Sequence, residues 1–244
     1  MQVSTNSVQE MEGVQEIETG APVCRVPGAI AWNYTRTETI ADLTIHVTGL
    51  CFGFAATAVL LAHTAIHAAT ADIVAASIYS LGLLSMLTIS AAYNLWPICP
   101  MKWWLRRFDQ SAIYVLIAAT YTPFVVDAKA GVTALCVLIG VWFVAALGIA
   151  AALTLPGRLD RISIGVYAGM GWSVAILWIA KEVPIPLAAF RLLVAGGVLV
   201  TVALIFHTSR ELRFQNAIAH LFVLLGITCH YAAVLSVVLG HAAT

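Results

Sequence analysis

The feature that most constrains this chain is a succession of long stretches without Asp, Glu, Lys or Arg. Seven such stretches occur: between Asp42 and Asp72, Asp72 and Lys102, Asp109 and Asp127, Lys129 and Arg158, Arg161 and Lys181, Arg191 and Arg210, and after Arg213. Over the 244 residues, 61% are hydrophobic and 10% are charged, whereas a soluble domain has about 25% charged residues. A chain this apolar needs lipid as its solvent.

Each stretch is long enough, or nearly so, for a helix that crosses a membrane. About 20 residues, at a rise of about 1.5 Å each, span the roughly 30 Å of hydrocarbon, and a backbone in lipid has to satisfy its own hydrogen bonds. The stretches are too long and too uniformly apolar for barrel strands. We therefore predict an all-α membrane protein, a seven-transmembrane helix bundle with a basic loop between the second and third helices. The expected helices lie near residues 43–66, 73–95, 110–126, 131–154, 162–180, 188–207 and 217–239.

The distribution of charge predicts the orientation of the bundle. With the N-terminus in the cytoplasm, nine of the twelve basic residues fall on the inner side, and only Lys129, Lys181 and Arg191 fall outside. Cytoplasmic loops of membrane proteins carry the excess of positive charge. We therefore predict a multi-pass protein of the cell inner (plasma) membrane, with its N-terminus cytoplasmic and its C-terminus outside. Residues 1–34 are expected to form a disordered cytoplasmic tail before a transmembrane domain over residues 35–244.

A set of polar side chains falls at the predicted cytoplasmic edge of four of these helices. They are Glu38 and the pair Asp42 and His46 in the first helix, the pair Ser90 and Asn94 in the second, Asp109 in the third, and the pair Asn216 and His220 in the seventh. The members of each pair are four residues apart, which places them on one face of their helix. Ionisable groups at membrane depth are costly and therefore mark candidate functional sites.

Simpler structural roles compete with function at several of these positions. Asp109 follows two arginines and also fits an interfacial salt bridge. His220 fits a structural hydrogen bond as well as metal binding, and helix packing explains His46. A second pair, His63 and His67, has the spacing of zinc ligands, but the sequence offers no third ligand nearby, so we expect ordinary interfacial histidines there.

The order of several short motifs adds a family resemblance. The motifs are Glu38…His46-x-x-Gly49, Ser90-x-x-Tyr93, Asp109-x-Ser111-Ala112-Ile113, Thr120-Tyr121-Thr122-Pro123-Phe124, Tyr167…Met170-Gly171-Trp172, Gly196-Gly197 and His220…Gly226…His230-Tyr231. Each motif is weak alone, but their order and spacing along most of the chain are specific. On these motifs the chain resembles the haemolysin III family, the bacterial branch of the progestin and adipoQ receptor superfamily.

The resemblance implies a zinc ion held by three histidines at the inner side of the bundle. In that family one histidine ends a Ser-x-x-x-His motif on the second helix, two form a His-x-x-x-His motif on the seventh, and an aspartate at the start of the third lies close by. Carried over, the resemblance assigns catalytic roles to Ser90 and Asp109 and a metal-ligand role to His220. The other two ligand positions are Asn94 and Asn216 in this chain.

The two asparagines change the chemistry that the resemblance implies. Neutral imidazole is a good zinc ligand, whereas an amide oxygen is a weak one. Without the ion, nothing at this site would activate a water for hydrolysis at neutral pH. We therefore expect weak zinc binding or none, and vestigial roles for Ser90 and Asp109. The same residues could instead form a hydrogen-bond network that links three helices.

Two classes of function remain open on this sequence. It favours a non-catalytic role in membrane homeostasis, sensing or cytolysis, for a family member with a degenerate zinc site. The alternative is a zinc-dependent lipid amide hydrolase of the ceramidase type, and a further alternative is an oligomeric pore. Membrane lipids are the expected partners, and equal numbers of acidic and basic residues argue against nucleic acid. A retinal protein needs a Schiff-base lysine in its last helix, and residues 217–239 contain no lysine.

Overall fold

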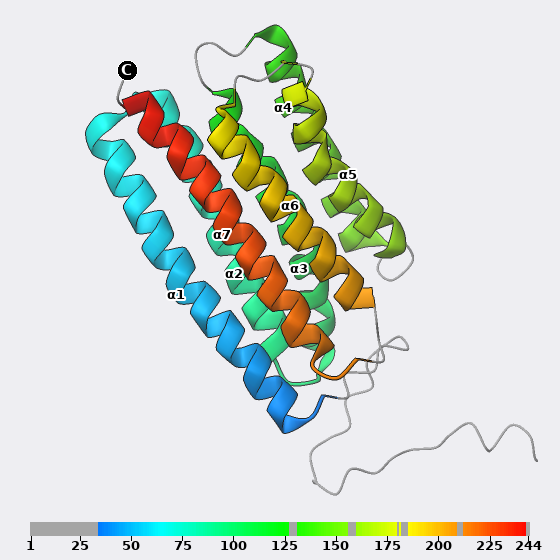
Figure 1. Ribbon diagram of the computed structural model, residues 1–244. Helices are drawn as coiled ribbons and strands as arrows, with labels where there is room; N and C mark the ends of the chain where they lie inside the picture. The colour runs from blue at the N-terminus through cyan, green and yellow to red at the C-terminus, as the bar shows by residue number, and fades with distance from the viewer. Residues whose placement is uncertain are drawn as a thin grey trace, which may run out of the picture.

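The computed structural model describes residues 34–126, 131–155, 160–179, 181, 185–208 and 212–242, and within them the chain forms seven helices and no strand. The helices are α1 (Arg36–His67), α2 (Thr70–Leu95), α3 (Pro100–Val125), α4 (Val132–Thr154), α5 (Asp160–Ile179), α6 (Leu187–Thr208) and α7 (Gln215–Ala242). Figure 1 shows them side by side in a single bundle. The predicted all-α bundle of seven helices is therefore confirmed. The expected tail, apart from Tyr34, lies outside the described residues.

The lengths and composition of the helices fit a membrane protein. Among the described residues, five helices are long and apolar enough to cross a bilayer, namely α1, α2, α4, α6 and α7, and α5 contains the shorter apolar segment Ile162–Ile176. Large apolar side chains such as Phe54, Val59 and Ile139 are exposed on the outside of the bundle. In a bilayer these side chains would contact lipid, so their exposure is consistent with the apolar composition of the chain.

The helix α3 begins at Pro100, so the predicted basic loop around Lys102 is wrong. Proline is well tolerated in the first turn of a helix, where its missing amide hydrogen has no intrahelical partner. Lys102 is only 6% exposed, and its ammonium donates to the backbone oxygens of Asn94 at 3.1 Å and Trp96 at 2.8 Å. A cation at the C-terminal end of α2 satisfies carbonyls that the helix leaves free. The connection between the two helices therefore shrinks to residues 96–99.

The helix α1 also begins earlier than predicted, because a capping box starts it. The Thr35 amide donates to Glu38 Oε2 at 2.8 Å, and the Glu38 amide donates to Thr35 Oγ1 at 3.4 Å. Such reciprocal bonds satisfy amides that a helix start leaves without a partner. Glu38 Oε1 also accepts from the backbone amide of Phe214 at 3.0 Å, just before α7. Asp42 and His46 consequently lie on regular helix beside the start of α7.

Close contact between α6 and α7 is the most extensive packing in the bundle, and glycines permit it. A Cβ atom at Gly226 would lie 3.0 Å from the Gly196 oxygen, and one at Gly196 would collide with the ring of His230. Small residues let helix backbones approach in this way in membranes. The main core lies among α1, α2, α3, α6 and α7, and a smaller cluster joins α3, α4 and α5.

Candidate metal centre

A group of polar side chains comes together where α1, α3 and α7 begin and α2 ends. We call this group the polar cluster: Asp42, His46, Ser90, Asn94, Asp109, Asn216 and His220. Apart from Glu38, which caps α1 and accepts from the Phe214 amide, it contains every residue that the sequence placed at the cytoplasmic edge of these four helices. Of these residues, Asp42, His46 and Ser90 are buried and the other four are partly buried.

Asp42 lies at the centre of the polar cluster. Its side chain is 10% exposed, and its Oδ1 lies 2.6 Å from Nδ1 of His220. Its Oδ2 accepts from Nδ2 of Asn216 at 3.4 Å and lies 3.6 Å from Nε2 of His46. A buried carboxylate without partners would be costly, and these contacts supply partners from α7. They therefore fasten the beginning of α1 to the beginning of α7.

One group of side chains among the described residues could hold a metal ion. It consists of Asp42, His46 and His220, whose ligand atoms all lie within 4.8 Å of one another, and we call it the metal triad. Zinc bonds of about 2.0–2.1 Å in a tetrahedral site keep donor atoms about 3.3 Å apart. The 3.6 Å separation of His46 and Asp42 fits that spacing, whereas the 2.6 Å contact of Asp42 with His220 is a direct hydrogen bond.

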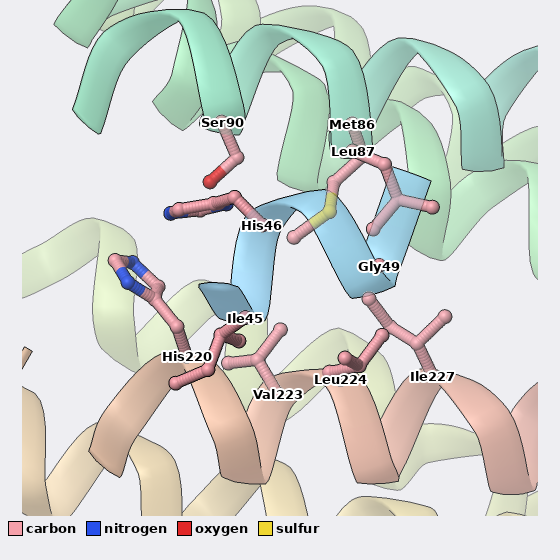
Figure 2. Close-up of a pocket in the computed structure, with 10 residues that line it drawn as sticks. All are labelled: Ile45, His46, Gly49, Met86, Leu87, Ser90, His220, Val223, Leu224 and Ile227. Atoms are coloured by element: carbon pink, nitrogen blue, oxygen red, sulfur yellow. The ribbon is translucent and has the colours of Figure 1, made fainter. Parts of the chain in front are cut away.

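The Nε2 atom of His46 is buried and has no hydrogen-bond partner among the described residues. His46, Ser90 and His220 are among the residues that line a cavity of about 30 Å³. Figure 2 shows the ring of His46 between Ser90 and His220, with Met86 and Leu87 toward the apolar end of the cavity. A space of this size admits a water molecule. An unpaired buried nitrogen costs free energy, which a bound ion or water would recover.

The side chains of Asn94 and Asn216 contact one another. Asn216 Nδ2 lies 3.3 Å from Oδ1 of Asn94, and Asn94 Nδ2 donates to the backbone oxygen of Ser90 at 2.9 Å. The structure thus contains a hydrogen-bond network across α1, α2 and α7, but its centre is Asp42, which was not part of the network that the sequence suggested. With amides engaged at these two positions, the residues present do not fit the three-histidine zinc site that the resemblance implied.

The residues that the resemblance made catalytic lie beside the metal triad. Ser90 is 6% exposed and borders the cavity. The Asp109 carboxylate, which α3 contributes, lies near the Ser90 hydroxyl and near His220, His46 and Arg106. Asp109 is not a member of the metal triad. The interfacial salt bridge of Asp109 stays a prediction.

Sequence reasoning did not identify Asp42 and His46 as candidate metal ligands. Their four-residue spacing was visible, but it indicated only a shared face of one helix. Their relation to His220 depends on the packing of α1 against α7, which no local pattern reveals. The other histidine pair, His63 and His67, has ring centroids 4.9 Å apart and belongs to no metal-binding group among the described residues.

Comparisons with known proteins place the matches to this chain in one family. A family model described as Haemolysin-III related matches residues 34–231. The chain is 33% identical to the Hemolysin-3 homolog of Bacillus subtilis (strain 168) over 202 residues, which cover 83% of this chain and 95% of that protein. It is 31% identical to Hemolysin-3 of Bacillus cereus over 205 residues, covering 84% and 94%. The Homo sapiens monocyte to macrophage differentiation factor is 25% identical over 167 residues, covering 66% and 69%.

Proposed function

The chain belongs to the haemolysin-III-related family, and on that premise we propose that it binds one divalent transition-metal ion at the metal triad. We propose further that it acts without catalysis, in sensing or membrane homeostasis, as a multi-pass protein of the inner (plasma) membrane. Zinc is the ion that we expect. The proposal keeps a metal at this end of the bundle but gives it other ligands than the three histidines that the family resemblance implied.

The observation that carries the proposal is the convergence of three donor atoms within 4.8 Å of one another, one of which, Nε2 of His46, is buried without a hydrogen-bond partner among the described residues. Two imidazoles and one carboxylate form a donor set that zinc and other first-row transition metals accept. Ca²⁺ and Mg²⁺ prefer six or more oxygen ligands, including waters, and this buried site offers fewer. The chemistry of the donors therefore supports zinc over the alkaline-earth ions.

The size of the cavity supports a non-catalytic role. About 30 Å³ admits a water molecule but not the amide and flanking chains of a lipid. A bound ion would instead join Asp42 and His46 on α1 to His220 on α7. Because an ion that binds only the folded arrangement stabilises it, the packing of α1 against α7 would respond to the concentration of the ion. Such a response is what a sensor requires.

A zinc-dependent lipid amide hydrolase is the second candidate. The observation in its favour is the position of Ser90 beside the cavity and of Asp109 beside Ser90. A zinc ion at the metal triad would supply Lewis-acid activation of a water molecule. Ser90 and Asp109 would then orient the water and the substrate, and the cavity would have to widen to admit the lipid.

Metal content tests the proposal directly. The full-length protein, purified in detergent and supplemented with zinc, should contain about one zinc ion per chain by elemental analysis. Asp42→Asn and His220→Ala should lose the ion. His63→Ala is the matched control, because it removes a histidine of the same helix α1 that lies outside the metal triad, and it should keep the ion.

The outcomes separate the candidate functions. A wild-type protein that stays metal-free after supplementation would refute the proposed metal site. Zinc-dependent hydrolysis of a lipid amide, lost in Asp109→Ala, would favour the hydrolase. The names of the two Bacillus relatives refer to haemolysis, so ion flux in proteoliposomes should be measured as well. Flux that depends on the protein and survives chelation would favour a pore.

A further inference from the structure

The asparagines at positions 94 and 216 form a chain of hydrogen bonds that ends on a member of the metal triad. Asn216 Nδ2 lies 3.4 Å from Oδ2 of Asp42 and 3.3 Å from Oδ1 of Asn94. Asn94 in turn donates to the backbone oxygen of Ser90 at 2.9 Å and to its hydroxyl at 3.4 Å. The amide of Asn216 is therefore held by α2 while it contacts the carboxylate on α1.

The other end of this chain is anchored by a buried cation. Lys102 Nζ donates to the backbone oxygen of Asn94 at 3.1 Å, and Lys102 is 6% exposed. This contact holds the last turn of α2, on which the Asn94 side chain lies. Ser90 holds the same side chain from one turn earlier. Asn94 is thus fixed on both its backbone and its side chain.

The hydrogen bond from Asn216 makes the two oxygens of Asp42 unequal. Oδ1 faces His220, whereas Oδ2 accepts from the amide of Asn216. An amide on one oxygen fixes the plane of the carboxylate and occupies a lone pair that bidentate binding would need. Zinc accepts a carboxylate through a single oxygen beside imidazoles. Ca²⁺ commonly takes carboxylates through both oxygens and needs six to eight oxygen ligands in total.

We propose that Asn216, held by Asn94, is a positioning residue of the metal triad, which fixes the Asp42 carboxylate and so favours zinc over Ca²⁺ and Mg²⁺. This inference rests on the proposed function, because it needs the triad to bind an ion. Hydrogen bonds to the ligands of a metal contribute about 10- to 100-fold in affinity. Asn94 and Asn216, the two positions that the resemblance assigned to histidine ligands, thereby act on the ion through its ligand Asp42 and do not bind it themselves.

The test is a titration of the full-length protein in detergent with Zn²⁺, and with Co²⁺, whose visible absorption reports the ligand set. Asn216→Ala should weaken zinc binding by about 10- to 100-fold, with about one ion still bound per chain at saturation. Its cobalt bands should match those of the wild type, since the metal triad is intact. Asn216→Gln, which keeps an amide donor, should recover part of the affinity. Gln215→Ala removes the neighbouring amide outside the network and should leave the affinity unchanged.

The result that overturns the inference differs from the result that overturns the proposed function. If the wild type binds zinc and Asn216→Ala binds it equally well, the inference is wrong and the metal site stands. Shifted cobalt bands in Asn216→Ala would make Asn216 a ligand, which also overturns the inference. A wild type that binds no ion overturns both. If Asn216→Ala does not fold, Asn94→Leu replaces it. Asn94→Leu should weaken zinc binding by a smaller factor, and unchanged affinity there would overturn the inference.

Discussion

Replacement of His46 by leucine shows separately how this residue affects the stability of the bundle and how it affects metal binding. Without a metal, Nε2 of His46 is buried without a hydrogen-bond partner among the described residues, and such a group typically costs about 1–3 kcal/mol. Leucine is apolar and similar in size, so it removes this cost. It also loses the ring contact with His220, whose centroid lies 4.7 Å away, and such contacts contribute about 0.5–1.5 kcal/mol. The 3.6 Å contact of Nε2 with Oδ2 of Asp42 is lost as well, at a cost of about 0.2–1 kcal/mol for a long ion pair whose carboxylate keeps other partners. These contributions nearly cancel, so His46→Leu should change the free energy of unfolding in a chelator by less than about 1 kcal/mol.

Zinc should make the wild type clearly more stable than His46→Leu. An ion that binds only the folded state adds about 2.7 kcal/mol to stability at a concentration of 100 Kd. The wild type should gain this amount, whereas His46→Leu has lost a ligand and should gain little. The difference in the free energy of unfolding between the two proteins should consequently change by about 2.7 kcal/mol between chelator and zinc.

Unfolding curves in detergent, with chelator and with zinc, measure both effects. His63→Leu is the control, because Nε2 of His63 is also buried without a hydrogen-bond partner among the described residues but lies outside the metal triad. This control should be at least as stable as the wild type in chelator and should keep the full response to zinc. A His46→Leu protein that is less stable than the wild type in chelator by about 3 kcal/mol or more, the cost of breaking a buried ion pair, would refute the argument from the missing hydrogen bond. An undiminished zinc response would remove His46 from the metal triad.

Three further predictions follow from the contacts described above. Asn94→His with Asn216→His adds two imidazoles beside His220 and should tighten zinc binding in a competition titration with a chelator; unchanged affinity would mean that these positions cannot converge on an ion. Lys102→Met removes charged hydrogen bonds at the end of α2. Unfolding curves in chelator should show a free energy of unfolding lower by about 1.5–3 kcal/mol, and stability equal to that of the wild type would contradict this prediction. Gly196→Val places a side chain against His230 and should cost about 1–3 kcal/mol or more, visible as a lower yield of folded protein; a normal yield and unfolding curve would show that α6 and α7 can separate without cost.

The boundaries of the helices show where sequence reasoning reached its limit. The spans over apolar residues were placed within a few residues, because hydropathy is a property of the local chain. The beginnings of α1 and α3 were placed too late. Charged residues there suggested loops, but Thr35 and Glu38 cap α1, and Lys102 of α3 turns back to the carbonyls of α2. Both effects depend on contacts with groups outside the apolar spans.

The sequence by itself determined that the chain forms a bundle of membrane helices, and that polar residues gather at one end of it. The need of a backbone in lipid for internal hydrogen bonds makes each apolar stretch helical wherever its neighbours lie. Only the tertiary structure decided that Asp42 and His46 meet His220 and that Asn216 contacts Asn94. Spacing along a helix defines a shared face, but it does not say which helix that face meets. That choice is made by packing over the whole length of the helices, as where the Tyr231 hydroxyl of α7 donates to the Ala56 oxygen of α1.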